Sequence, residues 1–221
     1  MIPWEPVGET RLPSGETMSL HRRGDEFSLR VAGLELMNSR QHGSEEALAA
    51  LALAELARPA QHVLIGGLGM GFTLRAALDA LPATARVSVA ELVPQVAEWN
   101  RGPLAHLAGR PLADGRVKLV VADVADLLAR ATRAYDAVLL DTDNGPEGTT
   151  HEGNERLYSP AGLRAAHGAL TPGGVLAVWS AFQSPAFARR LVAAGFAVSE
   201  KNVRSRGKKG VRHVVWLARR R

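Results

Sequence analysis

The sequence predicts an α/β protein with a doubly wound sheet of seven strands, and three observations support this fold class. Five short apolar runs lack polar alternation, which is typical of parallel strands buried on both faces. Helical segments separate these runs, and this order builds a sheet covered by helices on both faces. Two strand-like stretches near the end of the chain, 196–203 and 211–217, are joined by a loop too short for a helix, so they predict an antiparallel hairpin.

The strands and helices of this sheet can be placed along the chain. Ser44 is a suitable N-cap for the first helix, and Pro59 ends it. In such a sheet the ligand binds at the carboxyl ends of the strands. The apolar runs lie at 62–66, 86–90, 117–121, 136–140 and 174–179. The expected helices lie at 44–57, 71–80, 94–107, 124–131 and 160–170.

The N-terminal part follows a different pattern. Between residues 16 and 37, apolar and polar residues alternate around Phe27, Leu29 and Val31, with Gly24 and Gly33 as turn residues. This predicts a small β-hairpin module of two or three strands, which must pack on something larger to be stable. We therefore expect a small N-terminal β module at 1–43 and a Rossmann-like domain at 44–221.

Composition narrows the function classes. The 221 residues include no cysteine, which excludes disulfides, a thiol nucleophile and cysteine zinc sites. The seven histidines are scattered without metal-ligand spacing, so no metal site is expected. The first residues lack the basic start and long apolar run of a signal peptide, and no apolar stretch is long enough to span a membrane. A soluble, cytoplasmic protein is expected.

Positive charge is concentrated at the C-terminal end. The net charge is +5, but residues 201–221 carry nine basic side chains and no acidic one, so the rest of the chain is acidic on balance. A uniform nucleic-acid-binding surface is therefore not expected, although the basic hairpin leaves nucleic acid open as a partner.

A glycine-rich turn and two acids follow the first three strands. The spacing of the turn is G-x-G-x-G, which is not the dinucleotide pattern, but it lets a ligand approach the backbone. Glu91 ends the second strand, where an acid can accept from both hydroxyls of a ribose; it can also be an ordinary surface acid. Asp123 ends the third, where it can accept from an adenine amino group or simply cap the next helix. The glycines of the turn are Gly66, Gly67, Gly69 and Gly71.

Two further acids follow the fourth strand. Asp141 and Asp143 are candidate catalytic residues, because one can hold an ammonium group and the other can orient or deprotonate a nucleophile. The alternative is a turn built from Asp, Asn, Gly and Pro. His151, on the loop that follows, is either a general base or an exposed loop histidine.

These motifs resemble those of the spermidine synthase family, a branch of the class I S-adenosylmethionine-dependent methyltransferase fold. The resemblance covers about residues 34 to 179. The family's I-G-G-G-D-G-G loop corresponds to the run Ile65 to Gly71, and its D-S-S-D-P-x-G-P catalytic loop to the run Asp141 to Pro146, shortened by two residues. The resemblance implies that S-adenosylmethionine, or its decarboxylated form, binds at the glycine turn, Glu91 and Asp123. It also implies a homodimer.

Several positions depart from the family pattern. Gly69 or a neighbour replaces the aspartate that positions an aminopropyl group, and the tyrosine of the family's Y-[HQ]-E triplet is absent from the run Gly43 to Glu46. Gln41 precedes this run and faces either the methionine end of the cofactor or solvent. The basic loop at 204–212 is expected at the same sheet edge, where it would repel a dication such as putrescine.

These departures favour methyl transfer to a small or anionic acceptor. Two alternatives remain open: an aminopropyltransferase that uses decarboxylated S-adenosylmethionine, and a non-catalytic nucleoside-binding module.

Overall fold

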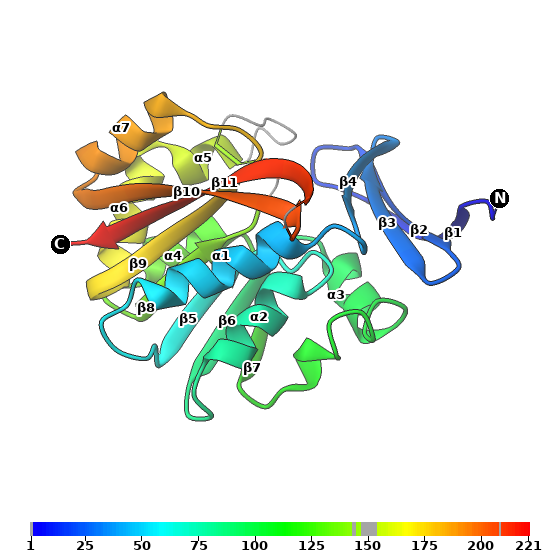
Figure 1. Ribbon diagram of the computed structural model, residues 1–221, viewed down its shortest axis with the longest axis horizontal. Coiled ribbons are helices and arrows are strands. Elements are labelled where there is room, and N and C mark those ends of the chain that lie inside the picture. The colour runs from blue at the N-terminus through cyan, green and yellow to red at the C-terminus, as the bar shows by residue number, and fades with distance from the viewer. Residues whose placement is uncertain (1, 143–144, 147–153, 208) are drawn as a thin grey trace.

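The computed structural model describes residues 2–142, 145–146, 154–207 and 209–221 and contains two sheets (Figure 1). The larger sheet has seven strands in the order β10-β11-β9-β8-β5-β6-β7. All neighbours are parallel except β11, which runs antiparallel to both β9 and β10. The predicted seven-stranded α/β fold is therefore confirmed. The strands are β5 (His62–Gly66), β6 (Arg86–Glu91), β7 (Val117–Val121), β8 (Tyr135–Leu140), β9 (Leu170–Ser180), β10 (Phe196–Arg206) and β11 (Lys209–Arg220).

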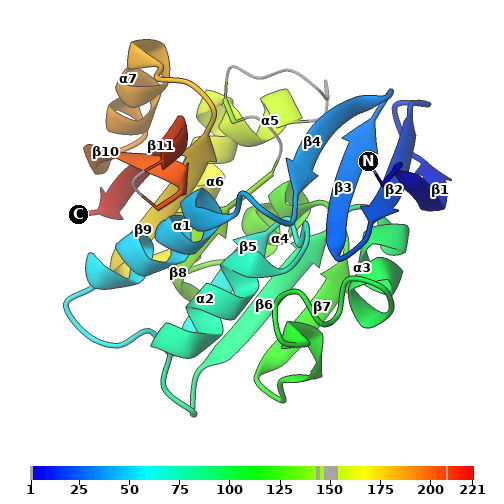
Figure 2. The same ribbon diagram turned by 45° about the vertical axis from the view of Figure 1, so that its right-hand side comes forward.

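Helices cover both faces of this sheet (Figure 2). Val63 and Ile65 of β5 belong to one buried cluster with helices α1 and α2, whereas Leu64 belongs to a second cluster with α4, α6 and α7. Successive residues of a strand point to opposite faces, so both faces of β5 are buried. This explains the apolar runs without alternation. The helices are α1 (Gly43–Ala54), α2 (Phe72–Ala80), α3 (Pro94–Arg101), α4 (Val124–Arg130), α5 (Asn154–Tyr158), α6 (Pro160–Ala169) and α7 (Pro185–Ala193), with a 3-10 turn at Pro111–Ala113.

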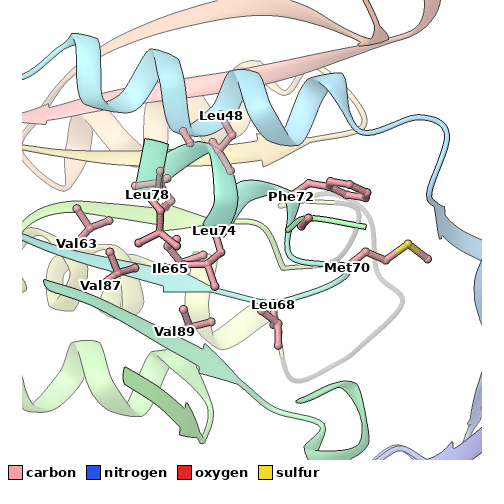
Figure 3. Close-up of a cluster of buried hydrophobic side chains, with 14 of the residues drawn as sticks. Leu48, Val63, Ile65, Leu68, Met70, Phe72, Leu74, Leu78, Val87 and Val89 are labelled. Atoms are coloured by element: carbon pink, nitrogen blue, oxygen red, sulfur yellow. The ribbon is translucent and has the colours of Figure 1, made fainter. Parts of the chain in front are cut away.

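Figure 3 shows the first of these clusters. Leu48 of α1 and Leu74 and Leu78 of α2 face the strand residues Ile65 and Val87. Each of these five side chains is at most 2% exposed. Full burial of a leucine or valine stabilises the fold by about 1.5–3 kcal/mol, so this layer holds α1 and α2 firmly against the sheet.

The smaller sheet is formed by the first four strands. These are consecutive antiparallel neighbours: β1 (Glu5–Arg11), β2 (Thr17–Arg23), β3 (Glu26–Val31) and β4 (Leu34–Asn38). The prediction of two or three strands at 16–37 is confirmed by β2, β3 and β4. The fourth strand, β1, was not predicted, because it contains Pro6 and Gly8, is mostly exposed and carries no apolar alternation. It forms through main-chain pairing with β2, with an irregularity between those two residues.

The small sheet packs on the larger unit, as expected. Leu20, Phe27 and Leu29 share the first cluster with Trp99 of α3. A Cβ at Gly8 would lie 3.1 Å from Trp99 Nε1, so the absence of a side chain there lets β1 pass close to α3. These contacts fix the small sheet beside the edge of the large one.

Two helix predictions need correction, and α5 and α7 were missed. The first helix is capped at His42 rather than Ser44, whose hydroxyl donates to Glu45 Oε2 at 2.5 Å instead. The third ends at Arg101, since the following Gly102 and Pro103 leave helical geometry well short of residue 107. Helix α7 was not predicted, although Ser184 caps it by accepting from the Phe187 amide at 3.0 Å.

Within the described part of the chain, no helix is both long and apolar enough to cross a bilayer.

Candidate functional site

The carboxyl ends of β5, β6 and β8 are joined by main-chain hydrogen bonds at one edge of the sheet. The Gly67 amide donates to the Ala90 carbonyl at 2.8 Å, and the Asp141 amide donates to the Gly66 carbonyl at 2.9 Å. The glycine turn therefore lies between the segments that carry Glu91 and Asp141. The structure thus brings these three predicted features together.

The glycines of this turn are required by its geometry. Gly67, Gly69 and Gly71 have φ angles of +87°, +52° and +86°, a region that side chains disfavour. A Cβ at Gly67 would lie 2.4 Å from the Asp141 carbonyl oxygen, and one at Gly69 would lie 3.1 Å from the Met37 side chain. Met37 is a residue of β4, and its side chain extends toward the turn. The small sheet therefore contributes a side chain directly over Gly69.

Glu91 ties the turn to the end of β6. It is 7% exposed, and its two carboxylate oxygens accept from the amides of Leu68 at 2.9 Å and Val93 at 2.8 Å. Burial raises the pKa of Glu91, and the backbone donors act against that rise. The amides of Leu92 and Gly69 act on the carboxylate in the same direction. Glu91 therefore supports the glycine turn from the end of β6.

Asp123 caps the helix that follows β7. One of its oxygens accepts from the Ala125 amide at 2.8 Å, so the capping alternative is realised. The other accepts from Arg156 at 2.7 Å, and Arg156 also contacts Asp126 at 2.8 Å. The carboxylate is thus fixed at the sheet edge by a helix terminus and an ion pair.

Asp141 is held by a threonine from α2. Its Oδ2 accepts from Thr73 Oγ1 at 2.5 Å, and the same hydroxyl lies 3.3 Å from the Glu45 carbonyl oxygen. Burial raises the pKa of Asp141 to about 6, and the Thr73 hydrogen bond acts in the opposite direction. Asp141 can therefore exchange a proton near neutral pH. Asp143 and His151 lie outside the described residues.

Glu45 is a further acid of this cluster that the sequence did not reveal. It is 8% exposed, and burial first and the charge of Asp141 second raise its pKa to about 7. An acid in the first turn of a helix is usually an exposed partner of the helix dipole, so the residue type gave no signal. Its spacing did give a signal, because Leu48, Ala49 and Ala52 follow Glu45 at intervals that place all four residues on the buried face of α1.

The tip of the C-terminal hairpin lies against the segment that precedes α1. Ser205 is 4% exposed, and its Oγ donates to Gln41 Oε1 at 3.0 Å and accepts from the Val211 amide at 3.1 Å. A cavity of about 290 Å³ between the small sheet and this hairpin is lined by both Gln41 and the exposed Arg206. The structure therefore places Arg206 of the hairpin close to Gln41, in a cavity that Arg23, Arg40, Glu26 and Glu35 also line. Lys208 lies outside the described residues.

The neighbour of Gln41 faces the glycine turn. The ring of His42 stacks on that of Phe72, with 4.0 Å between the ring centroids, and its Nδ1 lies 2.9 Å from Glu46 Oε1. Phe72 directly follows the last glycine of the turn. Gln41 itself reaches toward the hairpin rather than showing a contact with the turn.

A seven-stranded sheet of this order, with a glycine turn after β5, defines a class I methyltransferase-like protein. The predicted resemblance can now be made definite. The chain belongs to the family of the spermine/spermidine synthase domain, which matches residues 41–204. No curated protein matches the chain.

Solved structures share this fold. A spermidine synthase from Thermotoga maritima has a TM-score of 0.76 at 17% identity, and the match covers 98% of this chain and 72% of that synthase chain. A spermidine synthase in complex with the transition state analogue AdoDATO has a TM-score of 0.79 at 17% identity, with 98% and 74% covered. The 1,6-didemethyltoxoflavin-N1-methyltransferase of Burkholderia thailandensis, with bound 1,6-didemethyltoxoflavin and S-adenosylhomocysteine, has a TM-score of 0.57 at 24% identity, with 81% and 79% covered. The fold thus occurs in both kinds of transferase.

Proposed function

We propose that the protein is an S-adenosylmethionine-dependent methyltransferase that acts on a small or anionic acceptor. The observation that carries this proposal is Gly69, which stands where the family pattern has an aspartate. Glycine has no side chain, and the φ of +52° and the nearby Met37 both disfavour one at this point of the turn. The turn therefore offers no carboxylate to bind an aminopropyl ammonium group or to repel the carboxylate of intact S-adenosylmethionine.

The residues at the sheet edge fit an adenosyl group. Carboxylates at Glu91 and Asp123 can accept from the hydroxyls of a ribose and the amino group of an adenine, while Gly67 lets the main chain of Asp141 approach the turn closely. Gln41 is assigned to the methionine end. The complexes of related folds with AdoDATO and with S-adenosylhomocysteine support this class of ligand. When bound, S-adenosylmethionine supplies a methyl group whose bond to sulfur breaks as the acceptor bonds to it, with the electron pair left on sulfur.

The protein then contributes position and a base. Asp141 ends the buried strand β8 and exchanges a proton near neutral pH, so we assign it as the group that takes the acceptor's proton. Asp143 follows two residues later in the sequence, and we assign it as a second acid that orients the acceptor. The basic hairpin adds positive charge beside Gln41, which favours an acceptor with negative charge.

Family membership supports one alternative, aminopropyl transfer from decarboxylated S-adenosylmethionine to a diamine. The Gly69 position separates the two reactions. Gly69→Asp restores a carboxylate and should weaken binding of S-adenosylmethionine more than that of the decarboxylated form. Gly69→Asn is the matched control, because it has the same size and the same tolerance of positive φ without the charge.

The direct assay supplies putrescine and decarboxylated S-adenosylmethionine and monitors methylthioadenosine and spermidine. We expect negligible product from the unmodified protein. Robust formation of spermidine would overturn the proposal and establish aminopropyl transfer.

A further inference from the structure

We propose that the neighbouring acids Glu45 and Asp141 form one pair, in which Asp141 takes a proton from the acceptor and Glu45 is a positioning residue that stores the pair's other proton. This inference rests on the proposed function, because it assigns the chemistry of the same site. It names the acceptor class more narrowly: a molecule whose reacting atom carries a proton, such as a hydroxyl or a ring N–H group.

The hydroxyl of Thr73 lies between the carboxyl group of Asp141 and the main chain of Glu45. It lies 2.5 Å from Asp141 Oδ2 and 3.3 Å from the Glu45 carbonyl oxygen, but a hydroxyl has only one proton to donate. When Asp141 is ionised, Thr73 donates to it and leaves the carbonyl without this donor. When Asp141 is protonated, it can donate to Thr73, which then donates to the carbonyl. The arrangement therefore accommodates both protonation states of Asp141.

The surroundings of Glu45 disfavour its charge. The residue is 8% exposed, and its carboxyl group accepts from the Ser44 hydroxyl at 2.5 Å. The charged groups that act on it are Asp141, at the end of β8, and Glu46, on its own helix, and both are acids. From α2 it meets the uncharged Thr73, and from β10 the main chain of Arg204 and Ser205 lies beside Gly43, two residues away.

The pKa directions agree with this geometry. Burial raises the pKa of both acids, that of Asp141 to about 6 and that of Glu45 to about 7. Two interacting carboxyl groups lose their protons in two steps that belong to the pair. Near neutral pH the pair therefore holds about one proton and one negative charge.

A pair with one negative charge suits proton removal better than the binding of a dication. The acceptor's proton moves to Asp141, and the electron pair of the broken O–H or N–H bond stays on the acceptor atom. The pair is then neutral, and it returns the proton to solvent after the product leaves. Glu45 takes no part in the transfer itself, because its role is to keep the second charge out of the site.

The test is a pH titration of the side-chain carboxyl carbons by ¹³C NMR, in the full chain without ligand. In the unmodified protein we expect both carbons to show two-step curves, because each senses the ionisation of the other. Asp141→Asn should lower the pKa of Glu45, since it removes a like charge. Glu46→Gln is the matched control: it removes an exposed acid from the same helix and should lower that pKa less.

The Thr73 hydroxyl has its own variants. Thr73→Val keeps the shape but removes the hydroxyl, so the pKa of Asp141 should rise, because this hydrogen bond lowers it. Thr73→Ser should restore the original value. Single-step, independent curves for Glu45 and Asp141 in the unmodified protein would overturn the inference, even if a variant failed to fold.

Calorimetric binding of S-adenosylmethionine to the same samples separates the two claims. Binding with uncoupled titrations would defeat the acid pair alone. Coupled titrations without binding would defeat the proposed function, and with it the pair's assignment as a base.

Discussion

Glu91 Oε2 accepts the backbone amide of Leu68 at 2.9 Å, across 23 positions of the chain. The acid that ends β6 thereby fixes the glycine turn that ends β5. A residue assigned to ligand hydroxyls also shapes the backbone that the ligand would contact. Changes at Glu91 are thus expected to affect both binding and stability.

Glu91→Ala should weaken binding of S-adenosylmethionine by about 1.5–3 kcal/mol, the usual scale for hydrogen bonds to a charged group. Isothermal titration calorimetry measures this change. Glu98→Ala is the control, because Glu98 is an exposed acid of the neighbouring helix α3 that pairs with Arg101. Equal affinities in the two variants would remove Glu91 from the binding site.

Glu45→Gln should stabilise the protein at high pH. The pKa of Glu45 is about 7 in the folded state and lies near 4.5 without the fold, so the folded state holds more protons between these values. Stability contributed by this group is therefore present below pH 4.5 and lost as pH rises toward 7. Removing the charge should add on the order of 1–3 kcal/mol to the free energy of unfolding at pH 8, and little at pH 4.5.

Urea unfolding of the unmodified protein and the variant at both pH values measures this difference. Glu46→Gln, on the exposed side of the same helix, should show a smaller dependence on pH. A gain for Glu45→Gln that is the same at both pH values would contradict the buried-acid account.

Ser205→Ala should loosen the hairpin tip. The buried hydroxyl bonds both Gln41 Oε1 and the Val211 amide, so its loss leaves two groups without this partner. We expect a loss of about 1–3 kcal/mol in the free energy of unfolding. Ser199→Ala, at an exposed position of the same strand, should change stability little. Indistinguishable urea midpoints for the two variants would show that the contact does not hold the tip.

Arg206→Glu should raise the KM of an anionic acceptor more than it lowers kcat, because an exposed charge at the rim acts mainly on encounter. The effect should shrink as ionic strength rises, since screening weakens the attraction. Arg219→Glu is the control, because it makes the same charge change near the end of β11 that lies away from the hairpin tip. If both variants raise KM equally, the hairpin tip has no special role in acceptor capture.

Sequence reasoning predicted the large sheet well because its central strands β5, β6 and β8 are short, apolar and mostly buried, a pattern with few alternatives. It missed β1, which forms by main-chain pairing and carries no apolar alternation. Glu91 and Asp141 could be located because they follow apolar strands. Glu45 does not follow a strand, so only its spacing from Leu48, Ala49 and Ala52 on the buried face of α1 could have indicated its burial.

Calorimetric titration of the unmodified protein with S-adenosylmethionine and with its decarboxylated form tests the central claim most directly. The two ligands differ only in one carboxylate, and Gly69 has no negative side chain that would repel it. The proposed methyltransferase should bind S-adenosylmethionine at least about tenfold more tightly, a difference of about 1.4 kcal/mol. Tighter binding of the decarboxylated form would contradict the account.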